Sequence, residues 1–355
     1  MLDKNAALQE YAEKLPYYRQ VEETAVAAVK RVIGEQGFFV MEVAHRLKTP
    51  ESLVGKADRY GDTFQTLSDF YDLVGLRVIT YFDEDIERIA PAILQEFEVC
   101  EIRDKRKYEN AREFGYLSYH SICSLKDDGS LPRECYAIRF ELQIRTVLQH
   151  AWAEIEHDLG YKSDFGIPFA LRRVFSRVAG LLEIADSQFS DARKRSLAYT
   201  EMIRESIRED RIAELEISAP ALNIYVASGS FIRELFRELE QKHGIDIETA
   251  DISRYLDQLQ WLGVNTLGEF KELFLRGREY LDAALEELTR SEQLDIYSSD
   301  AILSLVMEAE LIRNRYAENQ LIQFYSLRYA DKARAGKRAE KIARIIESRP
   351  PDNGK

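Results

Sequence analysis

The sequence predicts an α+β fold, with a mixed β-sheet domain flanked by helices followed by an all-α domain. Up to about residue 216, strand and helix patterns alternate irregularly. Within this part a turn signal, KDDGS at 126–130, predicts at least one hairpin. From residue 217 onward the apolar residues recur mainly at helical spacing. We therefore expect two domains, residues 1–216 and residues 217–355.

The first domain is expected to begin with a helix over 5–34 that is broken near Pro16. Thr49 and Pro50 predict the N-cap and first residue of another helix. The strand at 72–82 (DLVGLRVITYF) is rich in β-branched residues. The other expected strands are 38–47, 98–103, 118–126 and 134–145, and the other expected helices are 85–97, one from residue 146, and 168–210.

In the second domain, the sequence TLGE at 266–269 is a capping-box pattern that predicts a helix start. The other expected helices are 231–242, 251–262, 276–290 and 299–335. The heavily apolar segment from Tyr255 to Phe274 has two competing uses, the core of this domain or exposed anchors for a partner. A basic tail follows from Arg328.

Composition limits the function classes. The chain has 355 residues, a net charge of −13 and three cysteines that are far apart, so we expect a cytoplasmic protein without a disulfide or cysteine metal site. The sequence has no run of 18 apolar residues, so no membrane span is expected. General attraction to nucleic acid is not expected at this charge, so any phosphate site must come from local basic clusters.

Residues 136–145 (YAIRFELQIR) alternate strictly between apolar and polar side chains, which is typical of a half-buried strand. One face would pack on a core. The other presents Arg139, Glu141, Gln143 and Arg145. An alternating strand can simply expose such a face to water, so the remaining sequence must decide whether it is functional.

A basic cluster lies at HRLKTPESLVGKADRY. Arg46 and Lys48 are two apart on a strand, and Ser52, Lys56 and Arg59 share one face of the next helix. The N-terminus of that helix adds free N–H groups and the positive end of its dipole. A solvated surface is the alternative reading, but the combination favours binding of a phosphorylated ligand.

Two carboxylates complete this prediction. Asp72 begins an apolar strand and Glu141 lies on the polar strand face, so neighbouring strands would let them share Mg²⁺. With Arg77 and Arg145 nearby, the group predicts phosphoryl or pyrophosphoryl transfer, where catalysis is mostly positioning and charge neutralisation. A further loop, REFGYLSYH at 112–120, can present Tyr116 for a base to stack on.

Together these motifs resemble the synthetase domain of the RelA/SpoT family of alarmone synthetases. The matching strings are R-x-K-x-P-x-S-x-x-x-K-x-x-R from Arg46, DLVGLRV from Asp72, GYLSYH from Gly115, ELQIRT from Glu141 and QHAWAEIEHDLGYK from Gln149. The resemblance covers roughly residues 20–200. It implies a nucleotidyltransferase-like mixed sheet. It also implies transfer of the β,γ-pyrophosphate of ATP to the 3′-hydroxyl of GTP or GDP, which makes (p)ppGpp.

The resemblance also implies roles for individual residues. Asp72 and Glu141 would hold Mg²⁺, with Glu141 also drawing the proton from the 3′-hydroxyl, and Arg77 would steady the ATP side. Tyr116 would stack on the acceptor guanine. The ATP phosphates would bind Arg46, Lys48, Ser52, Lys56 and Arg59, and the acceptor would contact Lys105, Arg112, His120 and Gln143.

The acceptor loop departs from the family pattern, because Phe114 replaces an Asn and Leu117 replaces a basic residue. The acceptor is therefore open. A toxin-type member that pyrophosphorylates tRNA 3′ ends or adenine nucleotides is one alternative, and a decayed sensor or scaffold is another. About 45 residues precede the match and hold no His-Asp hydrolase motif, so a one-way synthetase is expected. The helical second domain is an addition that would regulate, hold a homo-oligomer or bind a regulatory protein.

Overall fold

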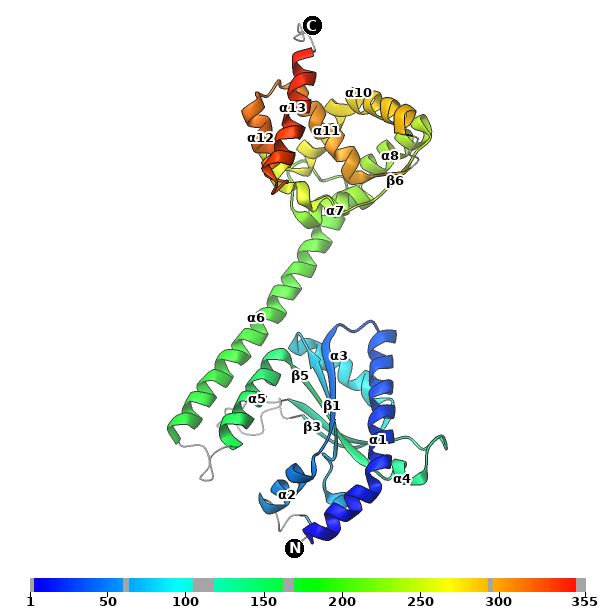
Figure 1. The fold of residues 1–355 in the computed structure, drawn as a ribbon, viewed down its shortest axis with the longest axis vertical. Coiled ribbons are helices and arrows are strands. Elements are labelled where there is room, and N and C mark those ends of the chain that lie inside the picture. Colours follow the sequence, from blue (N-terminus) through cyan, green and yellow to red (C-terminus); the bar gives the residue numbers. More distant parts are fainter. Residues whose placement is uncertain (1–2, 60–63, 105–117, 162–168, 293–295, 349–355) are drawn as a thin grey trace. The chain divides into compact units, whose positions relative to one another are not determined.

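The computed structural model describes residues 3–59, 64–104, 118–161, 169–292 and 296–348 (Figure 1). The chain divides into two compact units, Met1–Lys194 and Arg195–Lys355. The sequence places the domain boundary at residue 216 instead. The structural division comes earlier because the end of helix α6 (Phe169–Arg208) contributes Ile203 and Ile207 to the core of the second unit.

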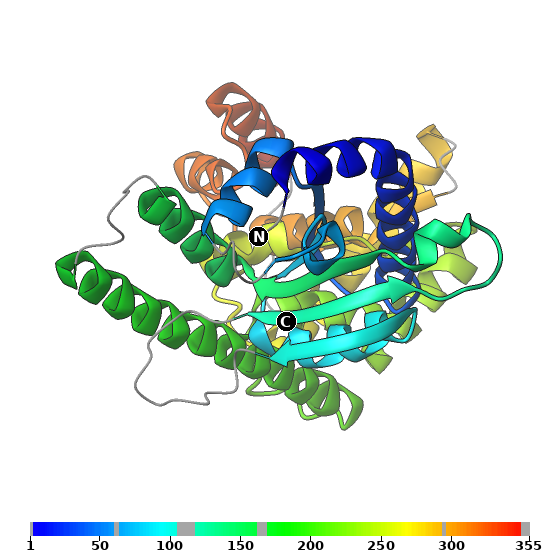
Figure 2. The same ribbon diagram turned by 90° about the horizontal axis from the view of Figure 1, so that it is seen from below.

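The first unit is built on a five-stranded sheet with the order β1-β2-β5-β4-β3. The bounds are β1 (Val40–Leu47), β2 (Val74–Thr80), β3 (Phe97–Asp104), β4 (Tyr119–Leu125) and β5 (Arg139–Thr146). Strands β2 and β5 are parallel, and the other neighbours are antiparallel. The predicted mixed sheet is confirmed, and Figure 2 shows β5, β4 and β3 side by side, coloured from green to cyan.

Helices cover one face of this sheet and leave part of the other open. The helices of this unit before α6 are α1 (Lys4–Glu35), α2 (Pro50–Arg59), the 3₁₀ helix η1 (Leu67–Asp69), α3 (Asp83–Leu94), α4 (Arg133–Tyr136) and α5 (Val147–Tyr161). Helices α1 and α3 contact each other and the sheet, and their apolar faces share one core with Leu76, Phe140 and Leu142. Alternation along β5 then turns Glu141 and Gln143 to the opposite face.

Two details of the first unit differ from the sequence prediction. Helix α1 continues through Pro16, because Tyr11 and Tyr18 on either side of the proline are buried in the same core. Strand β5 begins at Arg139 rather than at residue 134, because the preceding residues form α4, whose Cys135 is buried against α1. The predicted pairing of this strand with β4 is confirmed.

The second unit is mainly helical. Its elements after α6 are α7 (Ala219–Ser228), α8 (Ser230–His243), β6 (Asp246–Glu248), the 3₁₀ helix η2 (Ser253–Tyr255), α9 (Leu256–Trp261), α10 (Leu267–Glu292), β7 (Ile296–Ser298), α11 (Ser299–Arg313), α12 (Glu318–Ser326) and α13 (Lys332–Ser348). The sequence did not predict the short parallel pair of β6 and β7. The capping box before α10 is confirmed, since the backbone N–H of Glu269 donates to Thr266 Oγ1 and that of Thr266 to Glu269 Oε2, both at 3.1 Å.

Helix lengths in this unit also differ from the prediction. Helix α10 is one continuous helix, whereas the sequence predicts two helices, one from residue 266 and one over 276–290. Conversely, the sequence predicts a single helix over 299–335, where the structure has α11, α12 and the start of α13. The break after α11 falls at Arg315, whose φ of 49° is left-handed and ends the helix.

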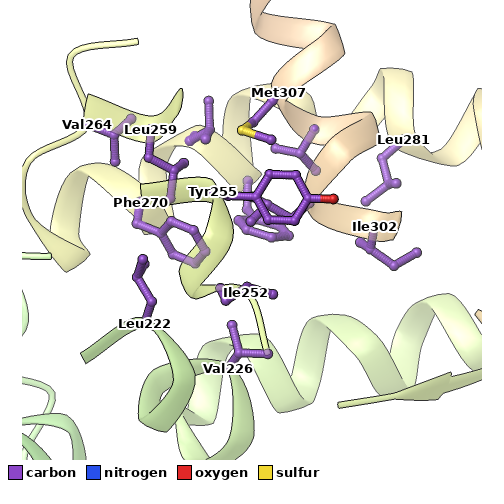
Figure 3. Packing of buried hydrophobic residues seen from close by; sticks show 14 of the residues in the cluster. Leu222, Val226, Ile252, Tyr255, Leu259, Val264, Phe270, Leu281, Ile302 and Met307 are labelled. Carbon is purple, nitrogen blue, oxygen red and sulfur yellow. The ribbon is translucent and has the colours of Figure 1, made fainter. Parts of the chain in front are cut away.

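The apolar segment from Tyr255 to Phe274 is core rather than an exposed anchor surface. Tyr255, Leu259 and Phe270 are each at most 1% exposed, and Figure 3 shows them pointing into one cluster with Met307 and Ile302. Packing therefore accounts for these side chains, and the alternative of partner anchors in this segment is wrong for them.

Among the residues that the structure describes, no helix has the length and apolar character needed to cross a membrane.

Two helical glycines give a matched test of packing in the second unit. A Cβ on Gly268 would lie 2.8 Å from the Cα and the carbonyl oxygen of Ala213, whereas a Cβ on Gly336 would meet nothing within 4 Å. Gly268→Ala is expected to lower the free energy of unfolding by about 1–3 kcal/mol. Gly336→Ala is expected to raise it by about 0.4–1 kcal/mol. Urea unfolding of both variants measures this, and equal effects would contradict the close approach at Gly268.

Candidate active site

The polar side of β5 faces a cleft. Gly75 on β2 pairs with Glu141 on β5 and with Arg46 on β1, and Arg77 pairs with Gln143. The open cavity along these strands encloses about 450 Å³. Its lining residues are Ala44, His45, Arg46, Asp72, Gly75, Leu76, Arg77, Glu141 and Gln143. Since Gly75 has no side chain, the floor between Arg46 and Glu141 stays open.

Asp72 lies at one end of this cleft, in the turn that leads into β2. Its Oδ2 lies 2.5 Å from Lys48 Nζ, and its Oδ1 lies 2.9 Å from Lys56 Nζ. Burial alone would raise the pKa of Asp72, but the two ammonium groups outweigh it and hold this pKa below its ordinary value. The carboxylate is therefore ionised at neutral pH and is shared by two cations.

The local sequence explains why these three side chains meet. The backbone N–H of Lys48 donates to Leu73 O at 2.8 Å, which extends the pairing of β1 and β2 as far as Asp72. Thr49 then caps α2, because its Oγ1 accepts from the N–H of Ser52 at 3.2 Å. This start orients α2 so that Lys56 faces Asp72. The N-cap predicted at Thr49 is confirmed.

Glu141 is held by a second hydrogen-bonded chain. Its Oε1 lies 2.9 Å from Nδ1 of His120, whose Nε2 lies 2.6 Å from Oγ of Ser118. The carboxylate accepts from Nδ1–H, which leaves Nε2 to accept from the serine hydroxyl. Burial and the charge of Asp72 would raise the pKa of Glu141, but His120 outweighs them and this pKa is lowered.

The other end of the cleft is basic. Arg77 Nη1 lies 2.5 Å from Glu154 Oε1 on α5, and the buried Arg145 donates to Gln143 Oε1. Burial, followed by the positive charge of Arg77, lowers the pKa of Arg145 to about 10. Arg145 stays charged at neutral pH, so the cleft carries a positive potential beside its two carboxylates.

The structure brings most of the predicted site residues together. Arg46, Asp72, Arg77, Glu141 and Gln143 line the cleft, Lys48 and Lys56 contact Asp72, and His120 contacts Glu141. Ser52 is exposed in the first turn of α2 and is not among the lining residues. Lys105, Arg112, Tyr116 and the side chain of Arg59 lie outside the described residues.

Two contributions were missed from the sequence. Glu154, on α5, is the ion-pair partner of Arg77. In the described part of the chain, no group of three or more His, Cys, Asp or Glu side chains is placed to hold a metal. Ser118 was noted only as part of a loop motif, whereas it is the outer member of the chain that holds Glu141.

Asp72 and Glu141 fit Mg²⁺ as a two-carboxylate donor set. Both line the same cavity, and the charge of Asp72 acts on Glu141 to raise its pKa, so two negative groups face one space. Mg²⁺ prefers such oxygen donors and takes its remaining ligands from water and substrate phosphates.

The first unit of the chain is similar in sequence to proteins of known family. Residues 45–165 match the family described as "Region found in RelA / SpoT proteins". The chain is 28% identical over 189 residues to GTP pyrophosphokinase YjbM of Bacillus subtilis, covering 50% of this chain and 86% of the relative. It is 26% identical over 152 residues to GTP pyrophosphokinase YwaC of the same organism, covering 42% and 71%. The crystal structure of small alarmone synthetase 1 from Bacillus subtilis is 25% identical, with a TM-score of 0.47 over 53% of this chain and 98% of that one.

The paired lysines predict a pH dependence of stability that Asp72 controls. Because the pKa of Asp72 in the folded state is below its ordinary 3.8, its contribution is present above that value and is lost as the pH falls through the folded pKa. The free energy of unfolding of the wild type should therefore fall more steeply below about pH 4 than that of Asp72→Asn. Urea unfolding across pH 3–7 measures this. Parallel curves for the two proteins would show that the ion pairs add no stability.

Proposed function

Since residues 45–165 place this chain in the RelA/SpoT family of alarmone synthetases, we propose that it is an ATP-dependent pyrophosphokinase. It transfers the β,γ-pyrophosphate of ATP to the 3′-hydroxyl of GTP or GDP. Its curated relatives are transferases of the GTP pyrophosphokinase type. The observation that carries the proposal is a single cleft that contains Asp72 and Glu141 between Lys48, Lys56 and Arg77.

The donor phosphates are proposed to bind at the Asp72 end of the cleft. Lys48 and Lys56 are held there by one carboxylate, so each ammonium has donors left for phosphate oxygens. Arg46 and Arg77 line the same cavity, and the N-terminus of α2, where Ser52 lies, adds N–H groups. These fixed charges stabilise the negative charge that moves during transfer.

Glu141 is proposed to accept the proton of the acceptor hydroxyl. The 3′-oxygen forms a bond to the β-phosphorus of ATP while the bond from that phosphorus to the α,β-bridging oxygen breaks, and AMP leaves with the electron pair. His120 donates to one oxygen of Glu141 and Gln143 also hydrogen-bonds this carboxylate, so the proposed base is held in place. Glu141 and Asp72 would also hold Mg²⁺, which supplies charge neutralisation at the phosphates.

The acceptor is proposed to lie on the same face of the sheet, beside β4 and β5. His120 and Gln143 are paired residues on β4 and β5, and Gln143 lines the cleft. The further acceptor contacts proposed for Lys105, Arg112 and Tyr116 come from the sequence alone. GTP or GDP is the proposed acceptor, and the cytoplasm is the proposed compartment. tRNA 3′ ends and adenine nucleotides are the competing acceptors, and incubating the protein with labelled ATP and each acceptor in turn distinguishes them.

We propose that the second unit regulates the enzyme or holds it in an oligomer. Its own core uses the apolar residues of α9 and α10, so any partner surface lies elsewhere on it. Removal of the chain from residue 219 would also leave Ile203, Ile207, Ile212 and Ile217 without their core. A truncation that tests this unit is therefore better placed at Lys194.

The first test concerns the two carboxylates. Asp72→Asn and Glu141→Gln should each abolish pyrophosphate transfer from labelled ATP, because each removes a charge needed for the metal or for the proton. Far-ultraviolet circular dichroism should show an unchanged fold. Asp58→Asn is the matched control, since Asp58 is on α2 and its ion-pair partner among the described residues is the exposed Lys4. Wild-type turnover in either carboxylate variant would overturn their assigned roles.

The second test concerns the donor phosphates. A charge-assisted hydrogen bond contributes about 1.5–3 kcal/mol, so Lys56→Ala should raise the ATP concentration needed for half-maximal rate by roughly 10- to 150-fold. Lys30→Ala, at an exposed position of α1, is the control and should match the wild type. Titrating ATP at a fixed concentration of GTP measures both, and an unchanged ATP dependence in Lys56→Ala would place Lys56 outside the donor site.

A further inference from the structure

A second cavity of about 620 Å³ lies in the first unit, against α1, η1 and α4, and is separate from the cleft. Its lining residues are Lys14, Tyr17, Tyr18, Leu67, Ser68, Phe70, Leu73, Glu134, Ala137, Ile138 and Arg139. None of these lines the cleft that contains Asp72. Small-molecule sites are mostly apolar cavities with a few placed polar groups, and this open cavity has a lining of that kind.

The walls suit a flat ring. Tyr17, Tyr18 and Phe70 supply aromatic surface, and Tyr18 and Phe70 are only 5% and 2% exposed. The hydroxyl of Tyr18 makes no hydrogen bond to another residue that the structure describes. Burial raises the pKa of Tyr18 to about 12, so this hydroxyl keeps its proton and can donate to a ligand.

The polar rim suits one phosphate group. Arg139 is fixed by stacking 4.3 Å from the ring centre of Tyr71 and by donating to Ser68 O at 3.4 Å. Lys14 Nζ lies 2.7 Å from Glu10 Oε1, and Glu134 adds a second carboxylate near the rim. Two cations can bind a single phosphate, whereas the nearby carboxylates would repel the larger charge of a triphosphate.

The walls of this cavity are connected to the cleft. Phe70 and Leu73 line the cavity and stand on either side of Asp72 in the chain. Leu73 O accepts from the N–H of Lys48, which is the ion-pair partner of Asp72.

A second connection runs through α1. Tyr18 stacks on Tyr11 with ring centres 5.4 Å apart, and the Tyr11 hydroxyl donates to Lys48 O at 2.7 Å. An occupant that moves either Tyr18 or Phe70 therefore acts on the Lys48–Asp72 pair.

We propose that this cavity is a second binding site, for a nucleoside monophosphate, and that its occupant alters the cleft through the residues that flank Asp72. The base lies against Tyr17, Tyr18 and Phe70, and the phosphate is bound by Lys14 and Arg139. The regulatory part rests on the proposed pyrophosphokinase activity, in which AMP is the leaving group; the binding part does not.

Binding is tested with AMP as the probe, by equilibrium dialysis and by photolabelling of the full chain with 8-azido-AMP followed by peptide mapping. Label is expected on the peptides that contain Tyr17 and Tyr18, and ATP should compete less well than AMP. Ala137→Trp places a large ring in the cavity from an exposed position and should abolish this labelling. Labelling of these peptides that survives Ala137→Trp, or none in the wild type, would overturn the site.

Two further variants separate binding from folding. Tyr18→Phe removes only an unpaired hydroxyl, so the unfolding midpoint should not fall, while the AMP dissociation constant should rise roughly 2- to 10-fold. Arg139→Gln should raise it roughly 10- to 150-fold, and Arg133→Gln, an exposed arginine on α4, should leave it unchanged. Equal effects of the two arginine variants would contradict a phosphate at Arg139.

Regulation is tested by the response of transfer to added AMP. Product inhibition at the cleft is common to the wild type and Ala137→Trp, so the difference between their AMP responses isolates the second site. A response at least 2-fold larger in the wild type is expected. Identical responses would overturn the coupling to Asp72. If the chain shows no transfer activity at all, the proposed function fails while the labelling result decides the site by itself.

Discussion

The site depends on one carboxylate, Asp72, which is shared by Lys48 and Lys56. Lys48 is 9% exposed, and a nearly buried ammonium without a partner would be strongly destabilising. The shared carboxylate therefore ties together the end of β1, helix α2 and the turn into β2. The Tyr11 hydroxyl on Lys48 O joins α1 to the same point. Asp72 and its two lysines thus fix where four segments of the first unit meet.

The remaining charges of the cleft follow the same principle. Glu154 pairs with Arg77, His120 holds Glu141, and Gln143 accepts from Arg145, so these groups already have fixed partners. Groups arranged in this way need little reorganisation when a polyanion arrives. The surplus is positive, because Arg46, Lys48, Lys56, Arg77 and Arg145 outnumber the carboxylates Asp72, Glu141 and Glu154. The acidic chain as a whole would repel a nucleotide, and the proposed nucleotide binding depends on this local surplus.

The sequence predicted the residue types of the site better than their contacts. Alternation identified the polar face of β5, and spacing placed Lys56 on one face of α2. That Gly75 lies between Arg46 and Glu141 depends on strand register, which is set by the packing of the whole sheet. Tyr136 fits the alternating pattern in the sequence, yet it belongs to α4 and not to β5. Its hydroxyl makes local contacts there, because it donates to Asp128 and accepts from the N–H of Leu131. The end of α11 was not predicted, because the residue with the left-handed φ at this point is Arg315 and not the usual glycine.

The parallel pairing of β2 with β5 has a consequence for how the cleft forms. Gly75 pairs with Glu141, about 66 residues later in the chain, with β3 and β4 in between. Closing a loop of this length costs conformational entropy before any contact compensates for it, and such non-local pairs form late in folding. A nascent chain that has not yet released residue 146 can form α1, β1 and α2, but it has no β5 and hence no cleft floor. The floor of the site is therefore a property of the completed first unit and cannot exist in a partly synthesised one.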